Sequence, residues 1–162
     1  MLINSHLFKK PEPIVFNVAP TPNRNNLTGV VGYEFTALRD INVVALGRFA
    51  GSTFTQDHPV KIWSAAGVLL SETIVTPSSE IDSLGWAYSN ATPVTLLDGE
   101  TYRIAVDEFN AGDNWVNQAN VTSLIFPGNV TVVRSVFATS VGVYPSSTSL
   151  NNAAFARPQI YE

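Results

Sequence analysis

The fold class shows most clearly in residues 58–75, which read His58-Pro59-Val60-Lys61-Ile62-Trp63-Ser64-Ala65-Ala66-Gly67-Val68-Leu69-Leu70-Ser71-Glu72-Thr73-Ile74-Val75. Val60 and Ile62 alternate with their neighbours at a period of two, as in a strand that buries one face. Ala65-Ala66-Gly67 has the composition of a tight turn, and β-branched residues follow it. The stretch therefore predicts a β-hairpin.

Short β-branched and aromatic runs, separated by Gly, Pro, Asn and Asp, recur along the whole chain. No stretch of 12 or more residues has the spacing of an amphipathic helix. Gly47 is expected to mark a bulge, and residues 97–100 have turn composition. The pattern favours an all-β fold, an antiparallel β-sandwich of jelly-roll or Ig-like type. Beyond the hairpin, strands are expected over residues 30–36, 40–49, 84–88, 92–96, 101–107, 130–136, 141–144 and 153–161.

Composition excludes several classes of protein. The chain has 162 residues, enough for one domain, with 45% hydrophobic, 10% aromatic and only 14% charged residues. So much apolar surface argues against disorder. A net charge of −4 argues against binding nucleic acid, and no apolar window approaches the ~20 residues that cross a membrane. With no cysteine, disulfide and thiolate chemistry are excluded.

Residues 1–28 differ from the rest of the chain and are predicted to form an extended, proline-rich N-terminal arm ahead of a sandwich domain at 29–162. The arm holds four of the ten prolines, and each proline favours extended backbone around it. An apolar clip lies between them. The arm either packs against its own sandwich or lies across a neighbouring subunit. For the second case, the expected partner-binding residues are Pro11, Pro13, Ile14, Val15, Phe16, Pro20 and Pro22.

Residues 29–160 resemble a family of uncharacterised bacterial β-sandwich modules. The resemblance is carried, in order, by Gly32-Tyr33-Glu34-Phe35-Thr36, Ile41 to Phe49, His58 to Leu70, Gly85-Trp86-Ala87-Tyr88 and Pro93 to Ile104. Such modules are common in secreted and surface proteins with a C-terminal sorting tail of the Pro-Glu-Pro type. The resemblance implies a sandwich with no catalytic residues to carry over. This chain departs from the pattern in lacking a signal and a sorting tail, as expected of a phage-borne copy.

Two loops carry candidate binding residues. Asp107, Glu108 and Asp113 are hard oxygen ligands that could hold Ca²⁺, although their spacing matches no EF-hand and such residues also serve as turn formers. Trp115 lies in a polar loop and is expected to be exposed. Together with Asn114 and Asn117 it forms a candidate ligand-binding set, for a sugar or for a protein partner.

Enzymatic function is not expected. His58 follows Asp57, so an Asp–His pair of a hydrolytic triad could be drawn, but no Gly-x-Ser-x-Gly motif supplies the nucleophile. A histidine at a strand edge or turn is the better interpretation. A glycosidase needs two carboxylates facing each other across a cleft, which a sequence alone does not reveal.

The sequence therefore predicts a non-enzymatic structural protein of a large assembly, a capsid cement or decoration protein or a tail component of a phage particle. Its expected partners are protein subunits of that assembly, with a homotrimer as the guessed oligomer and a virion surface as the location. No cofactor other than Ca²⁺, no nucleic acid and no membrane insertion is expected. The alternative is a carbohydrate-binding or adhesion module, extracellular or at a cell surface.

Overall fold

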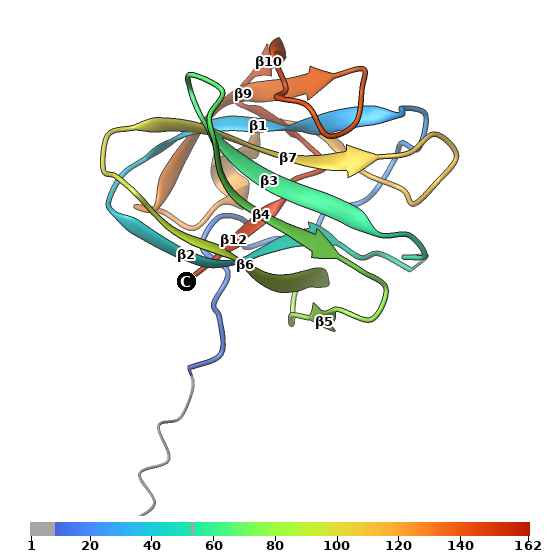
Figure 1. Ribbon diagram of the computed structural model, residues 1–162, viewed down its shortest axis with the longest axis horizontal. Helices are drawn as coiled ribbons and strands as arrows, with labels where there is room; N and C mark the ends of the chain where they lie inside the picture. Colours follow the sequence, from blue (N-terminus) through green and yellow to red (C-terminus); the bar gives the residue numbers. More distant parts are fainter. Residues whose placement is uncertain (1–8, 53) are drawn as a thin grey trace, which may run out of the picture.

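The protein consists of two antiparallel sheets packed face to face around one apolar core, the arrangement of a β-sandwich (Figure 1). The computed structural model describes residues 9–52 and 54–162. One sheet has six strands in the order β10-β9-β1-β7-β3-β4, and the other has four in the order β12-β2-β6-β5. A two-stranded ladder, β11-β8, completes the fold. The prediction of an all-β, antiparallel protein is confirmed.

The strands follow the chain in short, regular steps. The only helical element among the described residues is a short 3-10 turn, η1, at Val121–Leu124. No described helix is long and apolar enough to span a membrane. The strands are β1 Gly29–Ala37, β2 Ile41–Phe49, β3 His58–Ser64, β4 Leu69–Val75, β5 Glu80–Ile81, β6 Trp86–Leu96, β7 Thr101–Glu108, β8 Asn117–Ala119, β9 Val130–Ala138, β10 Ser147–Asn151, β11 Ala153–Phe155 and β12 Gln159–Tyr161.

The predicted hairpin is confirmed: β3 and β4 pair antiparallel, and the amide of Gly67 donates to the Ser64 carbonyl in the turn. Strand β1 lies at the centre of its sheet, between β7 and β9. Gly32 permits this close pairing, because a Cβ at that position would lie 1.9 Å from the carbonyl oxygen of Ile104. The close approach of β1 and β7 therefore requires a glycine at this position.

Four predicted segments differ in the structure. Residues 84–88 and 92–96 belong largely to one continuous strand, β6, because β2 pairs along its whole length. The register of β2 against β6 shifts between Val43 and Ala45, where the extra residues belong to β6, and Gly47 is regularly paired with Tyr88. Residues 153–161 form two strands, since Ala156 and Arg157 take left-handed backbone conformations between them.

Residues 141–144 form a turn, not a strand. Gly142 has a φ of 74°, which reverses the chain, and the ring of Tyr144 packs edge-on against Trp63 at 6.1 Å. The Tyr144 hydroxyl donates to the Ala65 carbonyl. The segment thus covers the outer face of the six-stranded sheet, which explains why apolar residues occur there without an extended ladder.

The described part of the N-terminal segment packs against its own sandwich. The amide of Ile14 donates to the Ile160 carbonyl, and Glu12 and Glu162 exchange two backbone hydrogen bonds, so residues 12–14 extend the sheet beyond β12. Val15 and Phe16 are fully buried. Of the two arrangements expected for the arm, residues 14–16 follow the first, because burying these side chains in the domain's own core removes them from water.

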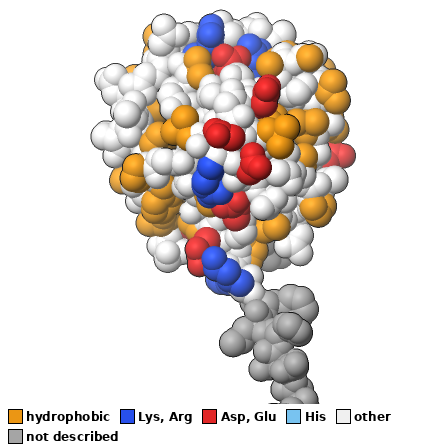
Figure 2. Space-filling model, turned by 90° about the vertical axis from the view of Figure 1, so that its left-hand side faces the viewer, with side chains coloured by type: hydrophobic (Ala, Val, Ile, Leu, Met, Phe, Trp, Pro, Cys, Tyr) orange, Lys and Arg blue, Asp and Glu red, His pale blue; other side chains and the backbone are white. Residues whose placement is uncertain are grey.

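The prolines of the segment lie in irregular or extended backbone, and Pro13 forms an antiparallel bridge with Tyr161. Pro20 is buried, and Pro11, Pro13 and Pro22 are half-buried against the same domain. On the face of the molecule that Figure 2 shows, acidic and basic side chains lie close to one another rather than gathered by sign.

Candidate functional site

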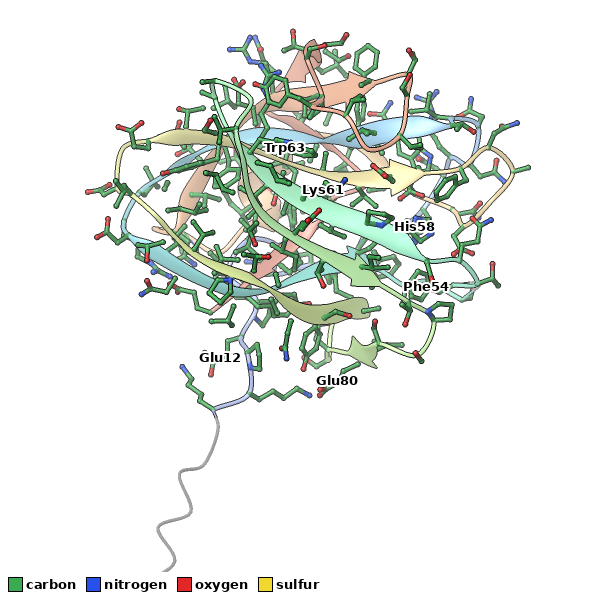
Figure 3. All side chains as sticks on the ribbon, viewed as in Figure 1. Glu12, Phe54, His58, Lys61, Trp63 and Glu80 are labelled. Atoms are coloured by element: carbon green, nitrogen blue, oxygen red, sulfur yellow. The ribbon has the colours of Figure 1, made fainter. Side chains whose placement is uncertain are left out.

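A cluster of buried charged residues lies at one end of the sandwich, between the two sheets. Arg48 comes from β2, His58 from the start of β3 and Glu108 from the end of β7, and all three are at most 1% exposed. Phe54 lies beside His58 in Figure 3, with ring centroids 5.7 Å apart. Charges this deeply buried require partners.

Arg48 and Glu108 form the first pair of the cluster. The Nε and Nη2 atoms of Arg48 donate to the two carboxylate oxygens of Glu108 at 2.8 and 2.9 Å. Burial raises the pKa of Glu108 above its ordinary value, against the opposing effect of Arg48. Arg48 also donates to the backbone carbonyls of Asp113 and Asn114, at 3.2 and 3.1 Å. The pair therefore reaches from the sheets to the loop after β7.

Asp113 fixes the same loop from the other side. Its carboxylate accepts hydrogen bonds from the amides of Thr55 and Gln56 and from the Thr55 hydroxyl, at 2.8–2.9 Å. Burial alone would raise the pKa of Asp113, but these bonds hold it below its ordinary value. His58 Nε2 lies 3.2 Å from the Asp113 carboxylate, and Nδ1 lies 2.8 Å from the Asp107 carbonyl oxygen. The cluster joins two loops to the ends of β3 and β7.

The three candidate calcium ligands, Asp107, Glu108 and Asp113, do not converge on one point in this structure. Asp107 and Glu108 are consecutive in β7, so their side chains point to opposite faces of the sheet. Asp107 accepts from the Gly142 amide, and burial raises its pKa. Glu108 and Asp113 are already engaged by Arg48 and by backbone amides. Among the residues that the structure describes, no group of three or more His, Asp or Glu could hold a metal ion.

His58 starts a strand, as expected, but it is fully buried rather than at an accessible edge. Its carboxylate partners are Glu108, at 3.4 Å from Nδ1, and Asp113, at 3.2 Å from Nε2, and not the adjacent Asp57, which is exposed. A general base must come within hydrogen-bond reach of its substrate. This histidine therefore serves the packing of the domain end.

The loop fixed by the cluster leads directly to Trp115. The Trp115 amide donates to the Arg24 carbonyl at 2.7 Å, and the amides of Asn23 and Arg24 donate back to the Trp115 carbonyl at 3.0 and 2.9 Å. Trp115 is thus held between the anchored loop and the N-terminal segment. It is only 5% exposed, which corrects the expectation of an exposed ring. The reason is that the N-terminal segment crosses the loop and covers it.

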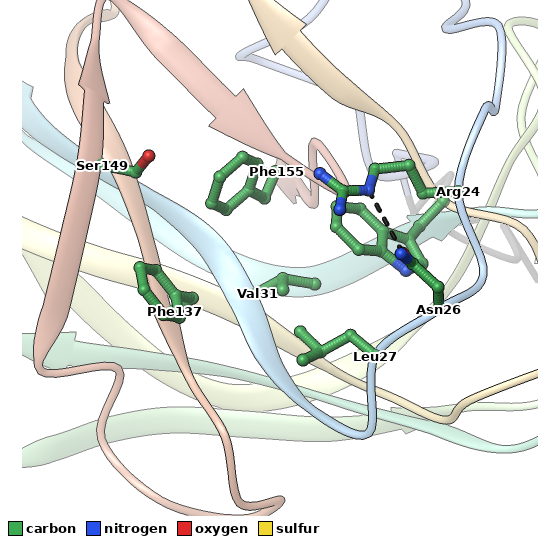
Figure 4. A pocket seen from close by; sticks show the side chains of 8 residues that line it. Arg24, Asn26, Leu27, Val31, Phe137, Ser149 and Phe155 are labelled. Atoms are coloured by element: carbon green, nitrogen blue, oxygen red, sulfur yellow. Dashed lines mark hydrogen bonds between the residues drawn. The ribbon is translucent and has the colours of Figure 1, made fainter.

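Trp115 contributes one wall of a pocket of about 270 Å³ (Figure 4). Its ring meets that of Phe155 edge-on at 5.8 Å, and its Nε1 has no hydrogen-bond partner among the described residues. The walls are mostly apolar, with three polar side chains at the rim. The apolar lining is Leu27, Val31, Trp115, Phe137 and Phe155, and the polar lining is Arg24, Asn26 and Ser149.

The other two residues of the predicted ligand-binding set lie elsewhere. Asn114 is exposed and lines a different pocket, with Pro20 and Pro22. Asn117 opens β8, where it pairs with Phe155, and its amide donates to the side-chain oxygen of Asn23. Sequence reasoning found Trp115 and missed Arg24, because no local pattern shows that residues so far apart in the chain form one ladder.

Comparison with known proteins places the chain in a family. No curated protein matches it. A family model described as "Domain of unknown function (DUF4082)" matches residues 18–156, which include both sheets except β12, the buried charged cluster and every residue that lines the Trp115 pocket. Because this match covers most of the sequence, the chain belongs to the DUF4082 family.

Proposed function

We propose that this protein is a non-enzymatic binding module that holds a glycan in the Trp115 pocket. The observation that carries the proposal is the lining of the pocket, which combines three aromatic side chains with three that can form hydrogen bonds. Aromatic faces pack well against the C–H faces of sugar rings, and polar rim groups bond to hydroxyls.

The rigidity of the pocket supports the same proposal. Arg48 and Asp113 fix the loop before Trp115, and backbone pairing with Arg24 fixes the tryptophan itself. A site whose walls are already ordered loses little conformational entropy when it binds. The buried charged cluster thus acts as the support of a binding site, and its residues take no part in chemistry.

Titration of the purified protein with glycans, read by tryptophan fluorescence and by a glycan array, tests this proposal. Trp115→Ala should abolish binding, while Ile74→Ala, which removes an exposed side chain of β4, should leave it unchanged. Far-UV circular dichroism of both variants checks that the fold is kept. Failure of every glycan to bind the native chain, or unchanged binding by Trp115→Ala, would refute the proposal.

A second candidate is the subunit of a phage particle, as a decoration or tail protein. Strand β10 favours it: all five of its residues are exposed, and it is the edge of the six-stranded sheet, open to pairing with another chain. Ile14, Val15 and Phe16 are buried in the core of their own domain, which weighs against their binding to a neighbouring subunit. Light scattering over a range of protein concentrations tests for the homotrimer, and detection of the chain in purified particles tests for the virion surface, against an extracellular or cell-surface location.

A further inference from the structure

We infer that the ligand of the Trp115 pocket is anionic, a sugar that carries a carboxylate, and that Arg24 is the residue that recognises it. This inference rests on the proposed glycan-binding function and narrows it to acidic sugars. Three features support it: the charge balance of the pocket, the free donors of Arg24 and the size of the cavity.

Among the residues that the structure describes, the lining of the pocket includes one cation and no acidic side chain. Although the whole chain has a net charge of −4, the potential inside a small pocket is set mainly by the charges that line it. A neutral sugar would leave the Arg24 charge without a counter-ion. A carboxylate would supply one in partly desolvated surroundings, where an ion pair is stronger than in water.

Arg24 differs from the other arginines in the described residues. Arg39, Arg48, Arg103 and Arg134 each form a salt bridge with a glutamate. Arg157 is buried, lies 4.3 Å from the Phe16 ring centroid and donates to a backbone carbonyl. Arg24 forms no salt bridge within the described part of the chain, and its one side-chain hydrogen bond runs from Nε to Asn26 at 3.2 Å.

The position of Arg24 leaves its terminal nitrogens available. The guanidinium carbon lies 5.2 Å from the Trp115 ring centroid, so the group stacks on the tryptophan. In Figure 4 the guanidinium extends across the pocket toward Phe155, and the dashed bond to Asn26 holds it by Nε alone. A stacked, planar guanidinium with free Nη1 and Nη2 atoms presents two parallel donors, the geometry that binds a carboxylate in bidentate fashion.

The cavity volume sets the size of the bound group. About 270 Å³ is close to the lower end of small-molecule sites, roughly 300–1,000 Å³. It therefore suits a single ring, with the rest of an oligosaccharide lying outside. Phe137 and Phe155 would contact the ring face, and Ser149 and Asn26 would bond to its hydroxyls. A uronic acid residue of a polysaccharide has all three features that these side chains would bind: a carboxylate, a ring face and hydroxyl groups.

Matched ligands test the inference. Short fragments of polygalacturonate, alginate and hyaluronan are titrated calorimetrically into the native chain, each beside its methyl-esterified form, which keeps the ring and removes the charge. We expect at least one acid to bind about tenfold or more tightly than its ester, as one charge-assisted bidentate contact provides. The preference should weaken when the salt concentration is raised from 50 to 500 mM, about a tenfold increase.

Two variants assign the preference to a residue. Arg24→Gln should bring acid and ester to equal affinity, whereas Lys9→Gln, which removes one exposed positive charge that does not line the pocket, should keep the preference. Equal binding of acid and ester by the native chain, or a preference that survives Arg24→Gln, would overturn this inference and leave glycan binding in place. Binding of neutral glycans alone would likewise overturn the preference for acidic sugars and leave glycan binding in place. Absence of binding by every sugar would overturn the proposed function itself.

Discussion

Replacing Phe16 by alanine is the most direct measure of how the N-terminal segment contributes to the fold. The ring of Phe16 is fully buried, meets Tyr33 edge-on at 5.4 Å and lies parallel to Trp86 at 6.3 Å. Folding removes about 150 Å² of apolar surface from water when it buries a phenylalanine ring. At about 25 cal/mol per Å², the alanine variant loses about 4 kcal/mol of this stabilisation. Measured Phe→Ala substitutions in cores cost about 3–5 kcal/mol. We therefore expect Phe16→Ala to lower the free energy of unfolding by about 4 kcal/mol.

Urea unfolding followed by tryptophan fluorescence measures this loss. Val18→Ala, two residues along the same segment but 45% exposed, is the matched control and should change stability by less than about 0.5 kcal/mol. Because the segment packs on its own domain, both results should be independent of protein concentration. A loss below about 1 kcal/mol in Phe16→Ala, or stability that rises with protein concentration, would show that the segment docks elsewhere.

Four further substitutions test the interior. Arg48→Met should lower the free energy of unfolding by about 3–5 kcal/mol, since it leaves the buried Glu108 carboxylate uncompensated, and adding Glu108→Leu should restore much of it in the same urea assay. The lowered pKa of Asp113 adds stability that is present above the ordinary aspartate pKa, about 4, and is lost as the pH falls below that value through the lower folded-state pKa. Asp113→Asn should therefore be less stable at neutral pH and should flatten the acid limb of a melting temperature–pH profile. Gly32→Ala should prevent pairing of β1 with β7, because its Cβ would meet the Ile104 carbonyl at 1.9 Å, and should appear as loss of soluble, folded protein.

Strand β7 illustrates what could be predicted from the sequence. In β7, Tyr102, Ile104 and Val106 point inward, as the alternation indicated, and all are buried. The β3–β4 hairpin was predictable for the same reason, since its turn residues separate two apolar runs. The alternation of apolar and polar side chains depends only on neighbouring residues, so it can be read directly from the sequence.

The site was predictable in its residues but not in its arrangement. Trp115 was singled out, yet its burial depends on Arg24, a partner supplied by a segment that the sequence sets apart as an arm. Asp113 was expected to be either a calcium ligand or a turn former, and its carboxylate accepts hydrogen bonds from the amides of residues 55 and 56, which no spacing rule connects to it. Contacts between loops far apart in sequence depend on how the sheets close, which local patterns do not encode.

The N-terminal segment and the pocket form one unit, and this decides which experiments can separate the two candidate functions. Residues 12–14 extend the four-stranded sheet, while Arg24, Asn26 and Leu27 line the pocket. Deleting residues 1–28 would therefore expose the apolar core that Phe16 covers and remove part of the ligand site at once. Loss of binding and loss of assembly would then both follow from damage to the fold. Point substitutions at the rim, where Arg24 contributes a half-buried side chain rather than part of the core, change the site while the segment stays in place.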